Sequence, residues 1–559
     1  MAVFPHLPLG QRIPGGPHSV SCSLPTMRDV RGYEEKDPAV MRALSSGYPR
    51  FVVHPFARRL AEYLIANDPA LRGRELWLVP SPGAAARLAA HLGGSSGARP
   101  FERDGLHGLS HPVSAEIAAR AKTYLQNTGG FLSSREAEDH LVRLGLLPAV
   151  HPELLHQGDA AAKVRAELRG ALTGTADADL FLAPSGMNAV WAAFRAASAL
   201  QAARGRTVWL QLGWLYLDTI AILQRFTGAP ENYVHIRDPL DFTAIERAFA
   251  AHDGRIAGVI AEVPTNPLIQ TPDLPALGAL CRRHGALLIV DPSIASIYEV
   301  DALPHADLLV TSLTKYTASE GDLTAGLVAV NPAGPDAAAL RSALPAELEP
   351  FYARDLARLA AQIGGTRDVL RQIDANAARV AAFLGSHPAV GEVRWALHAD
   401  SAGNFRRIAR HPGATGGMIT FTLRRAGALE AFYDRLRLPK GPSFGMKTTL
   451  VCPFMYLAHY DLVTTPAGRA ELAAAGSTPT CCASAAGRSR RRKSSARWPR
   501  RWVDRRHASL LHARGEGGAE RAAQHARRLA GRGPEGPRPG PAGRGPRQRG
   551  IVRVPRRGT

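Results

Sequence analysis

Short apolar runs alternate with helical stretches through the middle of the chain, from about residue 176 onward. The runs predict strands over 207–212, 256–263, 286–291, 307–312 and 326–331. Helical patterns lie between them, at 187–203 and 274–285. Strands that are apolar throughout and separated by helices are typical of a mainly parallel sheet covered on both faces. We therefore predict an α/β protein.

The two flanks of this region have other patterns. The first 47 residues are rich in Pro, Gly and Ser and predict an extended arm, and helical patterns follow at 56–66 and 139–147. Beyond about residue 336, a long helix over 355–385 precedes a strand at 417–423 and a helix at 427–436. We expect an arm, a large domain, a smaller C-terminal α/β domain and a tail, over residues 1–55, 56–335, 336–480 and 481–559.

The basic charge of the chain is concentrated in the tail. The 559 residues hold 69 Lys+Arg and 48 Asp+Glu, a formal net charge of +21. Residues 481–559 alone hold 22 of the basic and four of the acidic residues, which leaves 47 basic and 44 acidic residues before them. The first 480 residues are therefore nearly neutral, and the high overall charge does not by itself indicate a nucleic-acid-binding protein.

Cysteine usage and hydropathy narrow the class of protein. The five cysteines are irregularly spaced and form no zinc or disulfide framework, which favours a reducing compartment. The sequence contains neither an apolar run long enough to span a membrane nor a secretory or organellar leader pattern. We expect a soluble cytoplasmic protein.

Polar residues follow the predicted strands where each strand ends. Asn266 comes after the strand at 256–263, Asp291 ends the next one, and Lys315 follows the strand at 307–312. The carboxyl ends of parallel strands face one crevice, where ligands bind. Singly, such a lysine is usually a solvated charge and such an aspartate a helix cap. Together they suit an aldehyde cofactor that bears a phosphate and a pyridine nitrogen.

Four segments, FLAPSGMNAV, EVPTNPLIQTPDL, GALLIVDPSIAS and SLTKYTASEGDLTAG, together resemble the Cys/Met-metabolism family of pyridoxal-phosphate enzymes, which have fold type I. The N-terminal stretch HSVSCSLPTMRDVRGYEEKDPAVMRAL, followed by SGYPRFVVHPF, is similar to the fungal cystathionine γ-synthase branch. The resemblance covers roughly residues 8–475. It implies pyridoxal 5'-phosphate as cofactor and a homodimer or homotetramer whose active sites are shared between subunits.

The resemblance also implies roles for individual residues. Lys315 forms the Schiff base with the cofactor and moves protons, Asp291 pairs with the pyridinium nitrogen, and Asn266 hydrogen-bonds the phenolic oxygen. Tyr216 stacks on the ring and takes part in catalysis, although Leu217 and Asp218 replace the glycines that usually follow. The remaining implied residues are Gly186, Met187, Ser312 and Thr314 at the phosphate, Tyr48 and Arg50 at the phosphate of a neighbouring subunit, and Ser443 at the substrate.

The resemblance to the synthase branch implies replacement of the γ-substituent of an O-acyl-homoserine by cysteine, which gives cystathionine for methionine biosynthesis. A cystathionine lyase or a homoserine sulfhydrylase of the same family is the alternative, because γ-replacement and γ-elimination share their early steps. His459 is interpreted as a packed or surface histidine.

The tail admits two interpretations. As a disordered arginine-rich arm on an inactive family member it would bind nucleic acid, but aromatic residues for base stacking are nearly absent. The family resemblance instead calls for a strand with an arginine that grips the substrate carboxylate. If residues 480–484 are encoded ACC TGC TGC GCG TCA, reading one base earlier permits Asp-Leu-Leu-Arg-Val, so we favour the hypothesis that residues 481–559 are translated out of frame.

Overall fold

The computed structural model describes residues 6–45, 52–425, 427–474 and 482–485, which all lie in the first of two compact units, Met1–Arg490. At its centre is a seven-stranded sheet of order β6-β12-β11-β10-β9-β7-β8. Strand β12 runs antiparallel to β6 and β11, and the other neighbours are parallel, which confirms the mainly parallel sheet. The strands are β6 Leu180–Ala183, β7 Val208–Leu212, β8 Tyr233–Ile236, β9 Ile256–Glu262, β10 Leu287–Asp291, β11 Leu308–Ser312 and β12 Gly326–Val330.

The sequence pattern predicted the five inner strands to within one residue at each end and missed the two edge strands. The residues of β7, β9 and β12 are buried throughout. By contrast, β6 and β8 each contain half-buried positions, and β8 has one exposed residue. An edge strand lacks a neighbour on one side, so it does not need the continuous apolar run on which the prediction relied.

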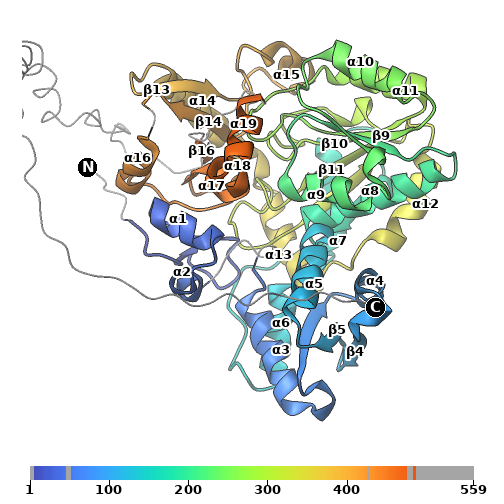
Figure 1. Cartoon of the computed structure of the whole chain (residues 1–559), viewed down its shortest axis with the longest axis vertical. Helices are drawn as coiled ribbons and strands as arrows, with labels where there is room; N and C mark the ends of the chain where they lie inside the picture. Colours follow the sequence, from blue (N-terminus) through green and yellow to red (C-terminus); the bar gives the residue numbers. More distant parts are fainter. Residues whose placement is uncertain (1–5, 46–51, 426, 475–481, 486–559) are drawn as a thin grey trace, which may run out of the picture. The chain divides into compact units, whose positions relative to one another are not determined.

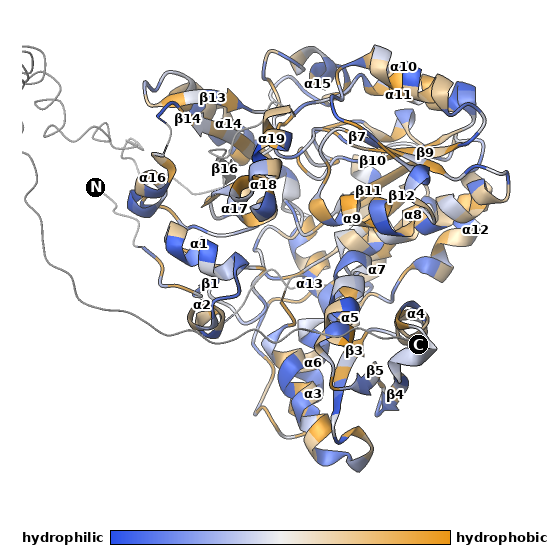
Figure 2. Cartoon of the chain, in the orientation of Figure 1, coloured by the Kyte–Doolittle hydropathy of each residue, from blue (hydrophilic) through white to orange (hydrophobic). Residues whose placement is uncertain are grey.

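Helices cover both faces of this sheet (Figure 1). Two hydrophobic clusters, one on each face, hold the core together. Helix α10 shows how the sequence achieves this, because Ile245 and Phe249 are four residues apart and both buried, while the helix carries both hydrophilic and hydrophobic residues (Figure 2). The helices that contribute are α8 Gly186–Ala202, α9 Leu217–Phe226 and α12 Ala337–Glu347 on one face, and α7 Ala160–Ala171, α10 Phe242–Ala251 and α11 Leu274–His284 on the other.

A second sheet of order β13-β14-β16-β15 lies in the C-terminal part of this unit. Its strands are Val390–Arg394, Met418–Leu423, Cys482–Ala485 and Leu450–Cys452, in that order, and all paired neighbours are antiparallel. The single helix predicted over 355–385 is wrong. Two helices, α13 (Ala353–Ile363) and α14 (Thr366–Gly385), are separated by Gly364 and Gly365, and paired glycines weaken a helix. The helix predicted near 427–436 is α16 (Leu429–Arg435).

The N-terminal arm is more ordered than its composition indicated. It contains a two-stranded ribbon and the helices α1 (Met27–Glu34) and α2 (Pro38–Ala43). A capping box between Thr26 and Asp29 starts α1, and Met27 packs into the core beside the second sheet. The prediction of a wholly extended arm is therefore wrong, because local capping outweighs the Pro and Gly content.

Residues between the arm and the large sheet form a third sheet that the sequence pattern did not predict. Strands β3 (Arg74–Val79), β5 (Leu106–Pro112) and β4 (Arg99–Arg103) are antiparallel neighbours in that order. Of the helices predicted there, α3 spans Pro55–Asn67, and α6 begins earlier than expected and spans Ser134–Arg143. The four-part division of the chain stays a prediction.

No helix in the described ranges is long and apolar enough to cross a membrane. Tyr48, Arg50 and the tail apart from the backbone of β16 lie outside those ranges. The hypothesis of a shifted reading frame therefore stays a prediction.

The position of β16 generates a test of where the folded protein ends. Because β16 pairs with both β14 and β15, we expect a chain that stops after Thr480 to lose two ladders and to melt roughly 5 °C or more below the full chain. A chain that stops after Arg490 is the control and should melt like the full chain. Thermal unfolding measures both, and equal melting of the two truncations would show that β16 contributes no stability.

Candidate active site

One pocket collects the residues that follow the strands of the large sheet. It lies at the ends of β9, β10 and β11 and at the start of α8. Eight of the predicted site residues line it, namely Gly186, Met187, Tyr216, Asn266, Asp291, Ser312, Lys315 and Ser443. Tyr48 and Arg50 fall outside the described residues. The parallel-strand rule thus predicted the common crevice for Asn266, Asp291 and Lys315, and the family resemblance implied the other five residues.

Lys315 lines the pocket and contacts the turn that carries Ser443 and Phe444. Its side chain is nearly buried, and its Nζ donates a hydrogen bond of 2.8 Å to Ser443 Oγ and lies 4.8 Å from the centre of the Phe444 ring. Ser443 has a φ of 83°, a left-handed conformation that is uncommon for a residue with a side chain. The strained turn aims the hydroxyl at the amine.

Tyr316 fixes the backbone beside this lysine. Its N–H donates to the carbonyl of Gly445 at 2.7 Å, and its buried hydroxyl donates to Ile294 O at 2.6 Å and accepts from Gly417 N–H at 2.9 Å. These bonds reach the turn after β10 and the segment that enters β14 (Met418–Leu423). The position of Lys315 therefore depends on both sheets.

Two buried acids stand side by side at the strand ends. Asp291 and Glu262 are register partners at the ends of β10 and β9. Burial raises the pKa of Asp291 to about 6, although the Ser293 N–H donates to its carboxylate at 2.8 Å. Burial, followed by the charge of Asp291, raises the pKa of Glu262 well above its usual value. Glu262 also accepts a hydrogen bond from the Tyr216 N–H.

Glu262 is the functional candidate that our reading of the sequence did not select. It ends its strand as Asp291 ends the next, so the same strand-end rule would have found it. Although Glu262 is buried, it lines the pocket, where it contacts Tyr216 and lies next to Asp291. It therefore belongs to the candidate site and not only to the core.

The start of α8 is pressed against the end of β11. A Cβ on Gly186 would approach the Ser312 Cβ to 2.8 Å, so only glycine fits there. Ser185 caps the helix by accepting from the Asn188 N–H at 3.1 Å. The N–H groups of the first helical turn have no partner within the helix and present positive partial charge, which suits an anion.

Thr314 and Asp218 are not among the residues that line the pocket. The Thr314 hydroxyl accepts from the Ala325 N–H at 3.0 Å and is not among the pocket-lining residues, so its role at a phosphate stays a prediction. Asp218 accepts from Gln126 and Asn127 at 2.9 and 3.0 Å. It therefore ties α9, which Tyr216 precedes, to α5 (Ala115–Thr128).

His459 lies away from the candidate chemistry. Its ring packs edge-on against Trp214, with 5.0 Å between ring centres, and burial lowers its pKa to about 4. This agrees with the interpretation of a packed histidine.

The buried acid at the end of β10 generates a prediction for the cofactor-free protein. The pKa of Asp291 is higher in the folded protein than in the unfolded chain, so the folded protein binds this proton more tightly. Protonated Asp291 therefore contributes stability at low pH, and this contribution is lost as the pH rises through about 6. We expect Asp291→Asn to raise the free energy of unfolding at pH 8 by roughly 1–3 kcal/mol, with little difference near pH 4.

Denaturant unfolding across this pH range measures the effect. The control is Asp104→Asn, whose carboxylate is 70% exposed and lies beside Arg103, which keeps its charge across this range, so the free energy of unfolding should change equally little at both pH values. A gain for Asp291→Asn that is the same at both pH values would contradict the ionic explanation.

Comparison with known proteins places this geometry in a family. The family model described as "Cys/Met metabolism PLP-dependent enzyme" matches residues 164–472. The L-2-amino-4-chloropent-4-enoate dechlorinase/desaturase of Streptantibioticus cattleyicolor is 41% identical over 465 residues, which cover 83% of this chain and 92% of that protein. The cystathionine γ-synthase of Neurospora crassa is 25% identical and covers 82% of this chain and 93% of its own length.

A solved structure agrees in fold. The cystathionine γ-synthase from Xanthomonas oryzae pv. oryzae, in complex with cystathionine, superposes with a TM-score of 0.51 at 22% identity, over 60% of this chain and 82% of that one. The predicted fold and cofactor are thus confirmed. The family match over more than half of the chain and the 41% identical relative together show that the chain belongs to the Cys/Met-metabolism family of pyridoxal-phosphate-dependent enzymes.

Proposed function

We propose that this enzyme releases a leaving group from C4 of an L-α-amino acid, and that its substrates are chlorinated amino acids of the L-2-amino-4-chloropent-4-enoate type. The observation that carries the choice of substrate is the 41% identity to the dechlorinase/desaturase over 92% of that protein's length. The fungal γ-synthase is only 25% identical over a similar share of its length.

The pocket fits pyridoxal phosphate. Helix α8 begins at Gly186, which lines the pocket beside Ser312, and the N–H groups of its first turn suit the phosphate. The Oδ1 of Asn266 is buried and has no hydrogen-bond partner among the described residues, so the side chain is available to a ligand. When bound, pyridoxal phosphate supplies an electron-withdrawing ring that stabilises negative charge at Cα.

The residues proposed to hold the cofactor follow from their positions. Asp291 would pair with the ring nitrogen, which removes the cost of its buried charge, and Glu262 beside it would stay protonated. Ser312 and Met187 would contact the phosphate next to Gly186. Tyr216 precedes α9 and lines the pocket, where its ring would stack on the cofactor.

Lys315 would carry out the proton transfers. Its amine would remove the proton from Cα, give that proton up and, as a free amine again, take one from Cβ, so that the substituent at C4 leaves with its electron pair. A proton then returns to Cα, so that the net loss is the Cβ proton and the leaving group. Ser443 holds the amine at 2.8 Å and would orient it between the two carbons. For a chlorinated substrate the overall change is loss of HCl.

The wall around Ser443 suits an apolar side chain. Its side chains are largely hydrophobic, from Met418, Phe444, Leu450, Cys452 and Leu457. A chlorovinyl group is apolar and buries favourably against such residues. Among the described lining residues there is no arginine for the substrate carboxylate, and β16, where the family resemblance expects one, has the sequence Cys-Ala-Ser-Ala.

Synthesis of cystathionine from an O-acyl-homoserine and cysteine is the second candidate. It is favoured by the similarity to the Neurospora crassa γ-synthase over most of both chains. The two candidates share the loss of the C4 substituent and differ in whether a thiol then adds.

The family resemblance implies an oligomer. We accordingly propose that this enzyme is a homodimer or homotetramer whose active sites are shared between subunits.

Substrate assays separate the candidates. We expect release of chloride from L-2-amino-4-chloropent-4-enoate and a product with the mass of the substrate minus HCl, detected by ion chromatography and mass spectrometry. Lys315→Ala is the control and should release none. Cystathionine from O-acyl-homoserine and cysteine, without chloride release in the first assay, would establish the second candidate instead.

The contact between Ser443 and Lys315 generates a paired test. Ser443→Ala and Ser443→Gly both remove the hydroxyl, so kcat should fall to a similar degree in each, by roughly 10-fold. Their stabilities should differ, because a φ of 83° strains alanine but not glycine, and Ser443→Gly should be about 1 kcal/mol more stable than Ser443→Ala. Steady-state kinetics and thermal unfolding measure the two effects, and an unchanged kcat would exclude a role for the hydroxyl.

A further inference from the structure

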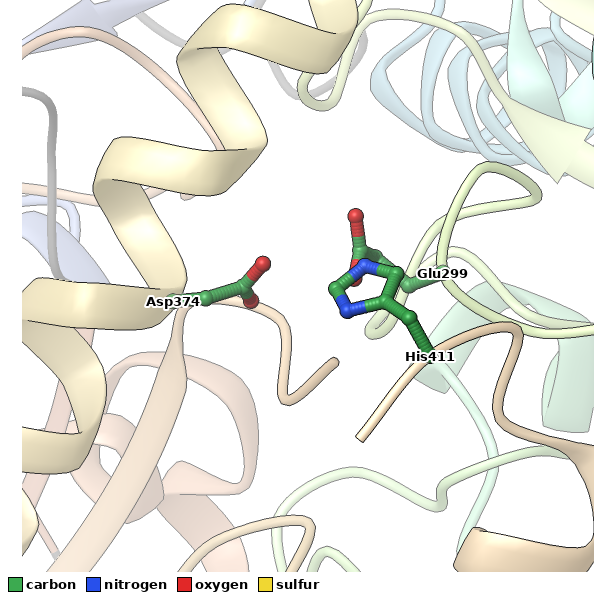
Figure 3. A group of neighbouring side chains, drawn as sticks. All are labelled: Glu299, Asp374 and His411. Atoms are coloured by element: carbon green, nitrogen blue, oxygen red, sulfur yellow. The ribbon is translucent and has the colours of Figure 1, made fainter. Parts of the chain in front are cut away.

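Two carboxylates and an imidazole meet away from the active-site pocket. Glu299 follows β10 in a loop, Asp374 belongs to α14 and His411 lies in the loop before β14. Figure 3 shows the three side chains converging. One candidate ligand atom from each lies within 4.8 Å of the others, and Glu299 Oε2 is 2.8 Å from His411 Nε2. Both carboxylates are buried, at 4% and 6% exposure, whereas the imidazole is about half exposed.

One oxygen of Asp374 lacks the partner that burial requires. Its Oδ1 accepts three hydrogen bonds, from the Thr415 N–H at 3.2 Å, the Thr415 hydroxyl at 3.0 Å and the Gly416 N–H at 2.9 Å. Its Oδ2 is buried and has no N–H or hydroxyl donor among the described residues; it faces the Glu299 carboxyl, with which only a shared proton could form a hydrogen bond. A buried carboxylate oxygen without a donor is costly, and facing a second carboxylate makes it more so.

Neighbouring cations offset this charge only in part. Arg367 and Arg410 act on Glu299 through space. Arg410 donates instead to Asp301 at 2.9 Å and to main-chain carbonyls, and Arg367 donates to Gly170 O at 2.7 Å and lies over the Tyr298 ring. Two buried carboxylates that face each other therefore favour a positive charge between them, either a proton or a metal ion.

We propose that Glu299, Asp374 and His411 bind a divalent transition-metal ion, with Zn²⁺ as the preferred ion. Two carboxylate oxygens and one imidazole nitrogen are a ligand set that Zn²⁺ accepts, with water completing the coordination. The half-exposed imidazole gives the ion access from solvent. Binding of the ion at this site does not rest on the proposed function.

The ion would tie together three segments around the active site. The loop of Glu299 begins just beyond Ile294, whose carbonyl accepts from the Tyr316 hydroxyl. The loop of His411 leads to Gly417, whose N–H donates to that same hydroxyl. Because Tyr316 directly follows Lys315 in the chain, the bound ion would stabilise the wall that positions the catalytic amine, although none of its three ligands lines the pocket.

Metal binding is tested on the holoenzyme with Zn²⁺ alone, by calorimetry and by elemental analysis after dialysis. We expect one Zn²⁺ per chain, and at least about 100-fold weaker binding in Asp374→Asn and in His411→Gln. His398→Gln is the matched control. His398 also lies near two acids, Asp400 at 3.4 Å and Glu392 at 3.8 Å, but these carboxylates are 44% and 43% exposed instead of buried, so the affinity of this variant should match the wild type.

The variants also separate a metal from a shared proton. The amide introduced by Asp374→Asn would keep the three hydrogen bonds to its oxygen and can donate to Glu299. A proton-bridged pair would therefore make this variant as stable as the wild type or more so, with no Zn²⁺ bound by either protein. His411→Gln, on an exposed side chain, tests the site without endangering the fold. Absence of Zn²⁺ binding at pH 8, or equal binding by wild type and both variants, would overturn the proposal.

Discussion

The active site depends on burying two acids at the ends of adjacent parallel strands. Asp291 and Glu262 are register partners, so the backbone ladder of β9 and β10 fixes their separation before any side chain is considered. Burial raises the pKa of both carboxyls. The sheet thus builds a place where a negative charge is costly. Under the proposed function, a cationic ring nitrogen beside Asp291 would offset that cost and gain affinity from it, so that stability of the cofactor-free protein would be exchanged for binding of the cofactor.

Tyr316 extends this constraint to the rest of the molecule. Its backbone follows Lys315, and its hydroxyl is bonded to the turn after β10 and to the segment that enters β14. A buried hydroxyl that donates and accepts leaves little freedom to its neighbours, because breaking either bond strands a buried polar group. The two sheets therefore cannot shift independently of the Lys315 side chain, and the cluster of Glu299, Asp374 and His411 joins the loop after β10 to the loop before β14.

Much of the fold and pocket follows from residue order alone, and the exceptions have local physical causes. Strands such as β9 are buried throughout and are recognisable as apolar runs, and the rule for strand ends then places Asn266, Asp291 and Lys315 in one crevice. The three-stranded sheet was missed because strands such as β4, with four of five residues exposed, carry no such run. The cluster around Asp374 was also beyond prediction, because its three residues come from distant segments that only tertiary packing unites.

In the second sheet, the pairing of strand β16 depends on its backbone, whereas binding of the substrate carboxylate would depend on its side chains. Strand β16 pairs through its backbone with β14 and β15, and ladder hydrogen bonds are available to any residue except proline. The sequence Cys-Ala-Ser-Ala can therefore close the sheet as well as a strand with an arginine would. The residues proposed to hold the cofactor, from Gly186 to Lys315, all precede β16 in the chain. Which reading frame encodes β16 therefore bears on how the substrate carboxylate is held, and not on cofactor binding or on the arrangement of the strands.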